Sequence, residues 1–415
     1  MGAFYDSLET RSADERESAQ FGALAALLAK SLAHAPGLAA RLAGLDAATV
    51  VDRAALACLP LIRKSELIEA QQVQPPFAGL TATPTGGLRR VFASPGPIYD
   101  PEGGGADWWR LARALFAAGI RRGELVHNAF SYHFTPGGRM FESGAHALGC
   151  PVFPAGTGNT DQQARAIADL RPSGYAGTPS FLKIILDRAD ELGLDSASLT
   201  KACVSGEALT AALRQGFEAR GIATSQCYAT ADLGLIAYET AAREGLVVDE
   251  GVIVEIVRPG TGDPVPDGEV GEVVVTAINR DYPLVRFATG DLSAVLAGPS
   301  PCGRTNLRLK GWMGRADQTT KIKGMFVHPH QIAAVLARHP ELGRARLVVE
   351  RGEDGDRLTL AIESAAAAGE GEGLDEAVRT SFQAVCTLRA AVTRHAPGSL
   401  PNDGIVIEDR RGAAS

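Results

Sequence analysis

Hydrophobic and polar positions change their rhythm along the chain, and each change predicts a different kind of structure. Residues 13–45 carry apolar side chains at helical spacing with a break at Pro36, which predicts two helices. From Trp108 to Cys227, short apolar runs alternate with amphipathic stretches. This alternation predicts an α/β sheet with covering helices, a fold in which ligands gather at the carboxyl ends of the strands.

The alternating region is divided into ten elements. Helices are expected at 108–120, 139–148, 161–170, 180–191 and 210–219, and strands at 125–129, 151–153, 174–176, 202–204 and 224–227. Past Leu246 the pattern favours strands, at 252–257 and 272–276, around a turn rich in proline and glycine. A small β subdomain is therefore expected to follow the α/β part.

The pattern changes again near Asp317 and predicts a compact α+β unit. Strands are expected at 319–323, 346–350 and 358–362, and helices at 330–339 and 374–388. We therefore predict two domains, residues 1–316 and 317–415.

Composition narrows the class of protein. The 415 residues are 45% hydrophobic and 21% charged, which is typical of a globular chain with more than one domain. The net charge of -7 makes a nucleic-acid backbone a poor partner. No run reaches the ~18 uncharged apolar residues of a membrane span, and the acidic start is unlike a secretory signal. None of the six cysteines forms a C-x-x-C pair, so we expect a reducing, cytoplasmic location.

The first candidate motif is the segment Ser205-Gly206-Glu207-Ala208, between a predicted strand and a predicted helix. A glycine at a strand end lets a flat ligand lie against the backbone, and the following helix offers free N–H groups. An ordinary strand-to-helix turn is the alternative interpretation.

A second motif follows the next predicted strand. Tyr228-Ala229-Thr230-Ala231-Asp232 places an aromatic ring four residues before a carboxylate. A ring that stacks on a base and an acid near a metal are what a magnesium nucleotide needs.

The third and fourth motifs are more specific. Arg286 to Asp291 ends an apolar strand with Thr289-Gly290-Asp291, where a carboxylate can accept both hydroxyls of a ribose. Gly314-Arg315-Ala316-Asp317 then places an arginine able to hold phosphate just before the predicted domain boundary.

These motifs, in this order and spacing, resemble the adenylate-forming enzymes, and among them the phenylacetate-CoA ligases. The resemblance extends from Tyr5 to Pro401. It implies a large N-terminal domain that binds ATP and a carboxylic acid, and a small mobile C-terminal domain. It also implies the reaction of an acid with ATP to acyl-AMP and pyrophosphate, followed by thioester formation with CoA.

The resemblance assigns roles to individual residues. Nucleotide binding is assigned to Ser205, Gly206, Glu207, Ala208, Tyr228, Ala229, Thr230, Asp291 and Arg315, and catalysis to Asp232, Arg315 and Lys323. Asp232 is the expected Mg²⁺ ligand and Asp317 the hinge. The acid pocket is assigned to Tyr132, His133, Phe134, Gly177, Thr178 and Pro179. The implied ligands are ATP or AMP, Mg²⁺, CoA and a small aromatic or aryl-acetic acid, with a homodimer left open.

Three departures from the family pattern point to weak adenylation. The stretch 91–103 has three prolines and no lysine in place of the phosphate loop, and its carboxylates are expected to repel polyphosphate. The magnesium-associated glutamate is replaced by the shorter Asp232. The family's C-terminal lysine is replaced by Ile405, and no lysine follows Lys323. A nucleotide or acyl-adenylate binding protein with little turnover, or an enzyme of the thioester half-reaction only, are the alternatives.

Three histidines can be given structural roles as well as functional ones. His133 is either a pocket residue or a packed polar-aromatic residue. His328 and His330 suit a helix-entry turn better than a metal site, because no cysteine or acid cluster accompanies them. A G-x-S-x-G hydrolase motif is absent from the sequence.

Overall fold

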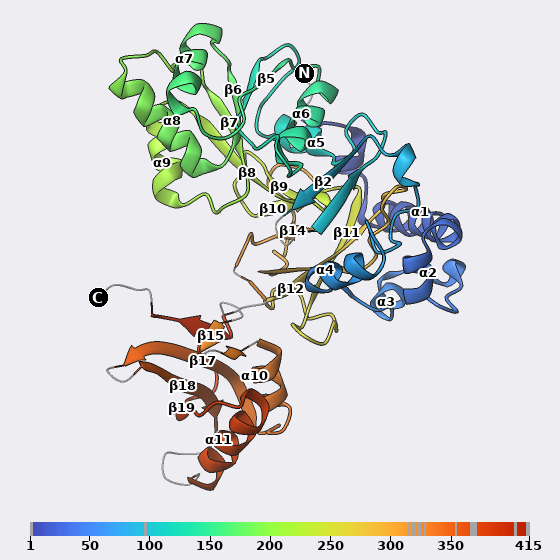
Figure 1. Ribbon diagram of the computed structural model, residues 1–415, viewed down its shortest axis with the longest axis vertical. Helices are drawn as coiled ribbons and strands as arrows, with labels where there is room; N and C mark the ends of the chain where they lie inside the picture. The colour runs from blue at the N-terminus through green and yellow to red at the C-terminus, as the bar shows by residue number, and fades with distance from the viewer. Residues whose placement is uncertain are drawn as a thin grey trace. The chain divides into compact units, whose positions relative to one another are not determined.

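The structure is a computed structural model that describes residues 3–94, 98–313, 315–316, 320–322, 325–327, 329–352, 355–365, 372–401 and 405–411 (Figure 1). It divides into two compact units. The first comprises Met1–Glu255, Val274–Thr289 and Val295–Trp312, and the second comprises Ile256–Val273, Gly290–Ala294 and Met313–Ser415. The predicted boundary and hinge at Asp317 lie outside the described residues and stay predictions.

An eight-stranded mixed sheet organises the first unit. Its parallel part consists of β4 (Val126–Asn128), β5 (Val152–Pro154), β6 (Gly174–Gly177), β7 (Lys201–Val204) and β8 (Ala223–Thr230). The antiparallel part consists of β9 (Gly234–Glu239), β10 (Leu246–Val248) and β14 (Arg308–Leu309). The strand order is β14-β10-β9-β8-β7-β6-β4-β5. The five predicted strands are therefore confirmed, whereas the sequence did not predict the antiparallel extension.

Helices cover both faces of this sheet. They are α5 (Leu111–Ala117), α6 (Gly137–Ala147), α7 (Thr160–Leu170), α8 (Pro179–Glu191) and α9 (Ala211–Ala219). Helices α7, α8 and α9 lie together on one side, and α5 and α6 lie on the other (Figure 1). Ile167, Leu182, Ile185, Val204 and Phe217 are among the buried residues that pack the α7 to α9 side. This apolar packing holds the helices against the sheet, so that a helix begins shortly after a strand ends. The candidate site lies at these junctions.

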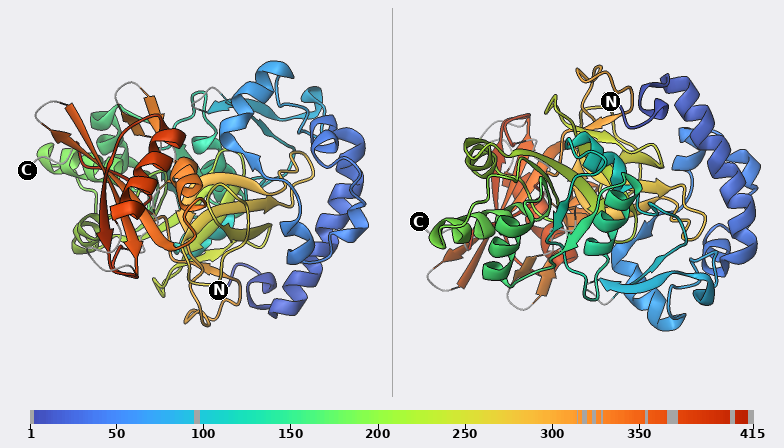
Figure 2. Two further views of the ribbon diagram at one scale, coloured as in Figure 1. Left: turned by 90° about the horizontal axis from the view of Figure 1, so that it is seen from below. Right: turned by 90° about the horizontal axis from the view of Figure 1, so that it is seen from above.

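The N-terminal segment begins with η1 (Ser7–Thr10), α1 (Ala13–His34) and α2 (Pro36–Arg41). Ser12 and Glu15 form a capping box at the start of α1, and Pro36 occupies the first turn of α2 as the sequence predicts. Helix α1 runs along an edge of the unit away from α7 to α9 (Figure 2). The sequence prediction of two helices split at Pro36 is confirmed.

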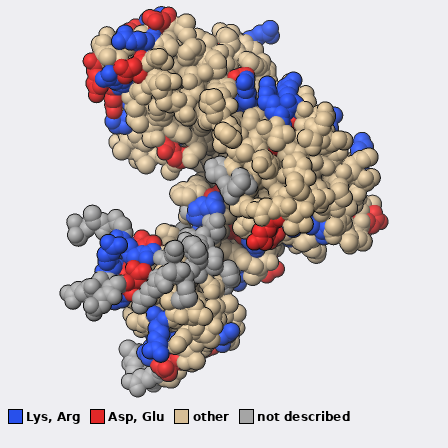
Figure 3. Space-filling model, viewed as in Figure 1, with Lys and Arg blue, Asp and Glu red and all other residues tan. Residues whose placement is uncertain are grey.

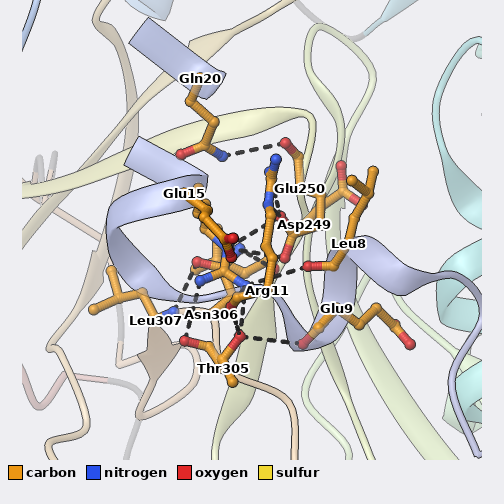
Figure 4. Close-up of polar contacts among 12 residues, drawn as sticks. Leu8, Glu9, Arg11, Glu15, Gln20, Asp249, Glu250, Thr305, Asn306 and Leu307 are labelled. Carbon is orange, nitrogen blue, oxygen red and sulfur yellow. Dashed lines mark hydrogen bonds and ion pairs between the residues drawn. The ribbon is translucent and has the colours of Figure 1, made fainter. Parts of the chain in front are cut away.

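Buried ion pairs tie this segment to the rest of the first unit (Figure 4). Arg11 and Arg16 each donate to the carboxylate of Glu250, at 2.6 and 3.0 Å, and the Gln20 side chain donates to the backbone oxygens of Glu250 and Val252. We call the arginine clasp the set Glu9, Arg11, Arg16, Arg110, Arg113, Asp249, Glu250 and Arg304.

Short elements connect the clasp to the candidate site. They are η2 (Ala47–Thr49), α3 (Arg53–Ala57), β1 (Ile62–Arg63), α4 (Lys64–Val73), η3 (Thr85–Gly87), and a hairpin of β2 (Arg90–Ser94) and β3 (Ile98–Glu102). A second sheet has the order β1-β13-β12-β11, with β11 (Val252–Val257), β12 (Gly271–Ala277) and β13 (Phe287–Ser293). The predicted strands after Leu246 are thus confirmed. Strand β1 runs parallel to β13, with Ile62 opposite Phe287 and Arg63 opposite Ala288.

The C-terminal part of the second unit is an α+β arrangement, as predicted. Strands β17 (Leu342–Gly352), β18 (Gly355–Ser364), β19 (Ala391–His395) and β20 (Ile407–Asp409) form a sheet of order β19-β18-β17-β20. It is accompanied by the hairpin of β15 (Thr320–Ile322) and β16 (Met325–Val327), and by helices α10 (Pro329–Leu336) and α11 (Glu372–Cys386). Ile332, Val335, Leu347, Leu360 and Phe382 lie in one buried core.

Charged side chains on the first unit are mixed in sign where α7 and α8 reach the surface (Figure 3). Arg188 pairs with Asp161 at 2.6 Å, and Arg220 pairs with Asp190 at 2.5 Å. Within the ranges described above, no helix combines the length and apolarity that a bilayer crossing needs. The cellular location stays a prediction.

Candidate functional site

Four loops meet at one edge of the large sheet. Because β4, β6, β7 and β8 pair in parallel, their carboxyl ends lie along the same edge. Gly206 has a φ of 86°, a left-handed conformation that favours glycine. A Cβ atom placed on Gly206 would lie 3.5 Å from Thr178 and 3.8 Å from Phe130. The loops after β4, β6 and β7 therefore converge at a residue without a side chain.

Ser205 and Glu207 link the loop after β7 to its neighbours. The Ser205 hydroxyl donates to the backbone oxygen of Cys227 at 2.8 Å, and Glu207 accepts from the backbone N–H of Ser180 at 2.6 Å. Gly206, Glu207 and Ala208 are exposed. These bonds fix the shape of the loop, and its proposed contact with a nucleotide stays a prediction.

Tyr228 connects the second motif to the third. Its hydroxyl donates to the Thr289 hydroxyl at 3.1 Å, and the residue is half-buried, like Ala229 and Thr230. The register of β8 against β9 shifts between Tyr228 and Ala229, an irregularity of the kind that re-aims a side chain. Thr289 belongs to the predicted motif from Arg286 to Asp291, but its contact with Tyr228 was not predicted from the sequence.

Asp291 and Arg315 are brought together in the second unit. Their backbones form an antiparallel bridge, and the Ala316 N–H donates to the Gly290 oxygen at 2.6 Å. The Arg315 guanidinium donates to the Asp291 carboxylate at 3.1 Å. The aspartate side chain is 11% exposed and the arginine side chain 46% exposed. The third and fourth motifs therefore present a cation on a nearly buried carboxylate.

Asp232 lies inside the first unit rather than on its surface. Its side chain is fully buried, and one carboxylate oxygen, Oδ2, accepts from the Lys64 ammonium at 2.7 Å. Within the part of the chain that the structure describes, the other oxygen, Oδ1, has no hydrogen-bond partner. Neither Lys64 nor its pairing with Asp232 was predicted from the sequence.

A second buried carboxyl group, Asp100 of β3, faces Asp232. Asp100 accepts from the Ser94 hydroxyl at 2.7 Å through Oδ2, while its Oδ1 has no partner in the described ranges. Burial first, and the charge of Asp232 second, hold the pKa of Asp100 well above its ordinary value. We call Asp100 and Asp232 the acid pair.

The acid pair supplies only part of the ligand set that the expected magnesium ion needs. Unpartnered carboxylate oxygens of the acid pair have the chemistry of hard oxygen ligands, which suits Mg²⁺. Among the described residues, no group of three or more His, Cys, Asp or Glu side chains could hold a metal ion alone. The site therefore fits an ion that brings most of its ligands with it, as Mg²⁺ does when it arrives with phosphates.

The β2 and β3 hairpin corrects one expectation. Its connecting residues 95–97, which include two of the prolines, lie outside the described residues. The carboxylates of this stretch were expected to face a polyphosphate, but they do not lie on the surface. Asp100 and Glu102 are both 1% exposed, and Glu102 accepts from Arg90 at 2.8 Å. Burial and pairing remove these charges from the surface.

The predicted acid-pocket residues are divided between the sheet edge and the surface. The Tyr132 hydroxyl accepts from the Asn128 side chain at 2.8 Å, beside the end of β4. His133 and Phe134 are exposed, with Phe134 at 82%, so the interpretation of His133 as a packed residue is wrong.

Across the edge, Gly177 is buried against Tyr175. A Cβ atom on Gly177 would lie 2.1 Å from the Tyr175 hydroxyl, which donates to the Thr178 backbone oxygen at 3.3 Å. Pro179 then begins α8. Sequence reasoning missed Phe130, whose ring stacks on Phe141 at a centroid distance of 4.4 Å. The signal available was an aromatic residue directly after a predicted strand.

Some predicted site residues cannot be placed. Lys323, Asp317 and Gly314 lie outside the described residues, as does His328, and the side chain of His330 is not described. Ile405 is described and half-buried, two residues before β20. The roles predicted for these residues stay predictions.

Comparisons with known proteins agree with this geometry. Residues 111–279 match the family described as AMP-binding enzyme. The phenylacetate-coenzyme A ligase of Thermus thermophilus is 33% identical over 321 residues, which span 74% of this chain and 71% of that protein. The corresponding ligase of Escherichia coli is 30% identical over 380 residues, spanning 86% and 84%. A crystal structure of 2-hydroxyisobutyryl-CoA ligase in complex with 2-HIB-AMP and CoA matches with a TM-score of 0.73 at 26% identity, covering 96% of this chain and 92% of that one.

Proposed function

From the premise that this chain belongs to the adenylate-forming enzymes, as an AMP-forming CoA ligase of the phenylacetate-CoA ligase type, we propose that its substrate is a small aromatic or aryl-acetic acid. In the first half-reaction a carboxylate oxygen attacks the α-phosphorus of ATP, and the bond to the bridging oxygen breaks to release pyrophosphate. In the second, the CoA sulfur attacks the acyl carbon, and the bond to AMP breaks.

The observation that carries this proposal is the pair of Asp291 and Arg315. A nearly buried carboxylate with an exposed arginine offers an acceptor for ribose hydroxyls beside a donor for phosphate. In the first unit, the bond from Tyr228 to Thr289 fixes the ring that is proposed to stack on adenine. Ser205, Gly206, Glu207 and Ala208 are proposed to line the same nucleotide.

Magnesium is proposed to accompany ATP and to be held by Asp232, whose unpartnered Oδ1 is the available ligand atom. When bound, the ion would neutralise charge on the phosphates. The chain itself positions Asp232 through the Lys64 ammonium. Lys323 and the hinge at Asp317 are proposed to serve the thioester step, in which the small domain turns.

The acid is proposed to enter beside Phe130 and Tyr132, opposite Thr178 and Pro179. These residues give the sheet edge apolar and aromatic surface with few polar groups, which suits an apolar carboxylate. The ligases that the chain resembles are named for an aryl-acetic acid, which supports the same choice.

Adenylation is proposed to be slow, because position 405 carries isoleucine where the resembled enzymes carry a lysine. The transition state spreads negative charge over the carboxylate and the α-phosphate, and an alkyl side chain cannot balance it. Two alternatives follow from this substitution: a nucleotide or acyl-adenylate binding protein with little turnover, or an enzyme of the thioester half-reaction only.

One pair of assays separates these outcomes. Pyrophosphate release is measured with a panel of aromatic, aryl-acetic and short aliphatic acids, and AMP release is measured from supplied acyl-AMP plus CoA. Both activities with an aromatic acid support the proposal. Activity in the second assay alone supports the thioester half-reaction, and tight acyl-AMP binding without either activity supports the binding protein. Preference for an aliphatic acid would contradict the proposed substrate.

A further inference from the structure

Lys64 stands where the nucleotide motifs lie, although it is far from them in sequence. It begins α4 directly after β1, and β1 runs parallel to β13 with Arg63 opposite Ala288. The next residue of β13 is Thr289, which Tyr228 contacts. Lys64 therefore enters the site from a separate element, at the level of the Thr289-Gly290-Asp291 motif.

The ammonium lies on the outer side of its carboxylate partner. The Lys64 side chain is 30% exposed, whereas that of Asp232 has no exposed surface. The buried carboxylate of Asp232 fixes the position of the Lys64 ammonium, while the ammonium itself stays partly exposed to solvent. An ammonium is a compact charge with rotatable donors, which suits contact with phosphate oxygens.

Lys64 supplies the cation that faces the acid pair, because its ammonium lies 2.7 Å from Oδ2 of Asp232. A positive charge therefore stands on the outer side of the buried carboxylate. Tyr282 also faces the acid pair, as a phenol whose pKa burial raises well above its ordinary value.

The same group anchors the hairpin that stands in place of a phosphate loop. Ser94, the last residue of β2, donates to Asp100 on β3 at 2.7 Å, and Asp100 faces Asp232. Residues 91–103 contain no lysine of their own. A cation from α4, linked to Asp100 of this hairpin through Asp232, can serve phosphates that the hairpin sequence cannot.

We infer that Lys64 is a phosphate-binding residue of the nucleotide site, and that Asp232 is its positioning residue. This inference rests on the proposed function, because it supposes that a nucleotide binds beside Tyr228 and Asp291. Residues 91–103 lack the lysine that the family's phosphate loop carries. The inference assigns the contact between a cation and the phosphates to Lys64 instead.

The test compares ligands that differ only in their phosphates. Affinities for adenosine, AMP and ATP, with and without Mg²⁺, are measured by calorimetry for the natural chain, Lys64→Met and Lys64→Arg. Lys183→Met is the matched control, because Lys183 also pairs with an aspartate, Asp187, but on an exposed face of α8. The double variant Lys64→Met with Asp232→Asn removes both charges and guards against a misfolded single variant.

Lys64→Met is expected to leave adenosine affinity within about twofold and to weaken ATP binding by about 10- to 100-fold, the scale of one charge-assisted hydrogen bond. AMP should lose less, Lys64→Arg should recover part of the loss, and Lys183→Met should match the natural chain. Without Mg²⁺, the double variant should show the same loss for ATP as Lys64→Met.

Two results would overturn the inference alone. These are equal losses for adenosine and ATP, which indicate a structural role, and unchanged ATP affinity in both Lys64→Met and the double variant. Failure of the natural chain to bind adenosine, AMP and ATP would instead overturn the proposed function, and this inference with it.

Discussion

Two of the groups of buried carboxylates described in the first unit, the arginine clasp and the acid pair, have partners of different kinds. In the arginine clasp, Glu250 accepts from two arginines, and Asp249 accepts from two others. In the acid pair, Asp232 has one lysine, and the second carboxyl group, that of Asp100, faces it. One group is surrounded by rigid arginine donors, and the other has a single ammonium.

We propose that this difference separates a structural role from a ligand-binding one. Glu250 is held between two arginines, whereas Asp232 has one ammonium that is partly exposed. Only seven of the 41 basic residues are lysines, so the choice of Lys64 over the commoner arginine also stands out. The planar guanidinium of arginine holds a carboxylate in one orientation, whereas the ammonium of lysine has rotatable donors and can exchange partners.

The largest effect should come from breaking the clasp. Glu250→Gln leaves Arg16, which is 4% exposed, without its carboxylate, and is expected to lower the free energy of unfolding by about 3 to 5 kcal/mol. Urea unfolding followed by tryptophan fluorescence measures the loss. Asp232→Asn is the comparison variant and should change the same quantity by less than about 1 kcal/mol, because water can solvate Lys64. Equal losses would remove the distinction between the two groups.

The next effect concerns a cation added to the site. Ile405→Lys is expected to accelerate acyl-AMP formation by about a hundred- to a thousand-fold, or about 3 to 4 kcal/mol, because it supplies charge to the transition state. Single-turnover adenylation measures the gain, with Ile405→Met as the control for side-chain length. Thioester formation from supplied acyl-AMP should stay nearly unchanged. Fast adenylation by the natural chain, without a gain from lysine, would show that the role given to position 405 is wrong.

Asp291 tests whether a carboxylate paired with an exposed cation behaves as a ligand site. Asp291→Ala is expected to weaken AMP binding by about 2 to 5 kcal/mol, because it removes charge-assisted hydrogen bonds to the ribose. Calorimetry gives the affinity, and Asp263→Ala, at an exposed turn, is the matched control. Equal AMP affinity in the natural chain and Asp291→Ala would contradict the assignment.

The smallest effect concerns Asp107, a carboxylate with neither arginines nor a lysine as its main partner. Burial raises its pKa to about 6, although it accepts from the backbone N–H groups of Leu111 and Ala112 at 3.0 and 2.9 Å. The folded state therefore holds a proton that the unfolded chain releases nearer pH 4. This contribution to stability is present below pH 4 and is lost as the pH rises toward 6.

Asp107→Asn should remove this dependence. Between pH 5 and 7, the unfolding free energy of the variant relative to the natural chain is expected to rise by about 1 kcal/mol. Chemical unfolding of both proteins at the two pH values measures it. A constant difference between the two proteins would show that Asp107 has an ordinary pKa in the folded state.

The sequence predicted the strands that end at the site, because their alternation with helices is local and periodic. It placed Gly206 just after a strand, as the structure has it, but Tyr228 and Asp291 lie inside β8 and β13 rather than at their ends, because both strands continue past the motifs. Lys64 was missed because its place depends on the register of β1 against β13, which local patterns do not encode.

Asp100 left a weak signal. It shares a strand face with Ile98, which is buried, so a carboxylate stood on an apolar face of the predicted hairpin region. Its raised pKa follows first from burial and then from the charge of Asp232, more than a hundred residues away, and neither could be inferred from the neighbouring sequence. Phe130 lies two residues before Tyr132 of the predicted acid pocket. Only the packing of the three loops around Gly206 shows that Phe130 belongs to the same site.

The clasp also dictates an order of assembly during synthesis. Glu9 pairs with Arg304, which lies 295 residues further along the chain, so the clasp cannot be completed on the ribosome until Arg304 has been synthesised. At the usual 5 to 20 residues per second, that synthesis takes about 15 to 60 s. Contacts this distant in sequence are slow to form because loop closure must come first. A nascent chain stalled before Arg304 should therefore leave its first helices open to proteases and chaperones.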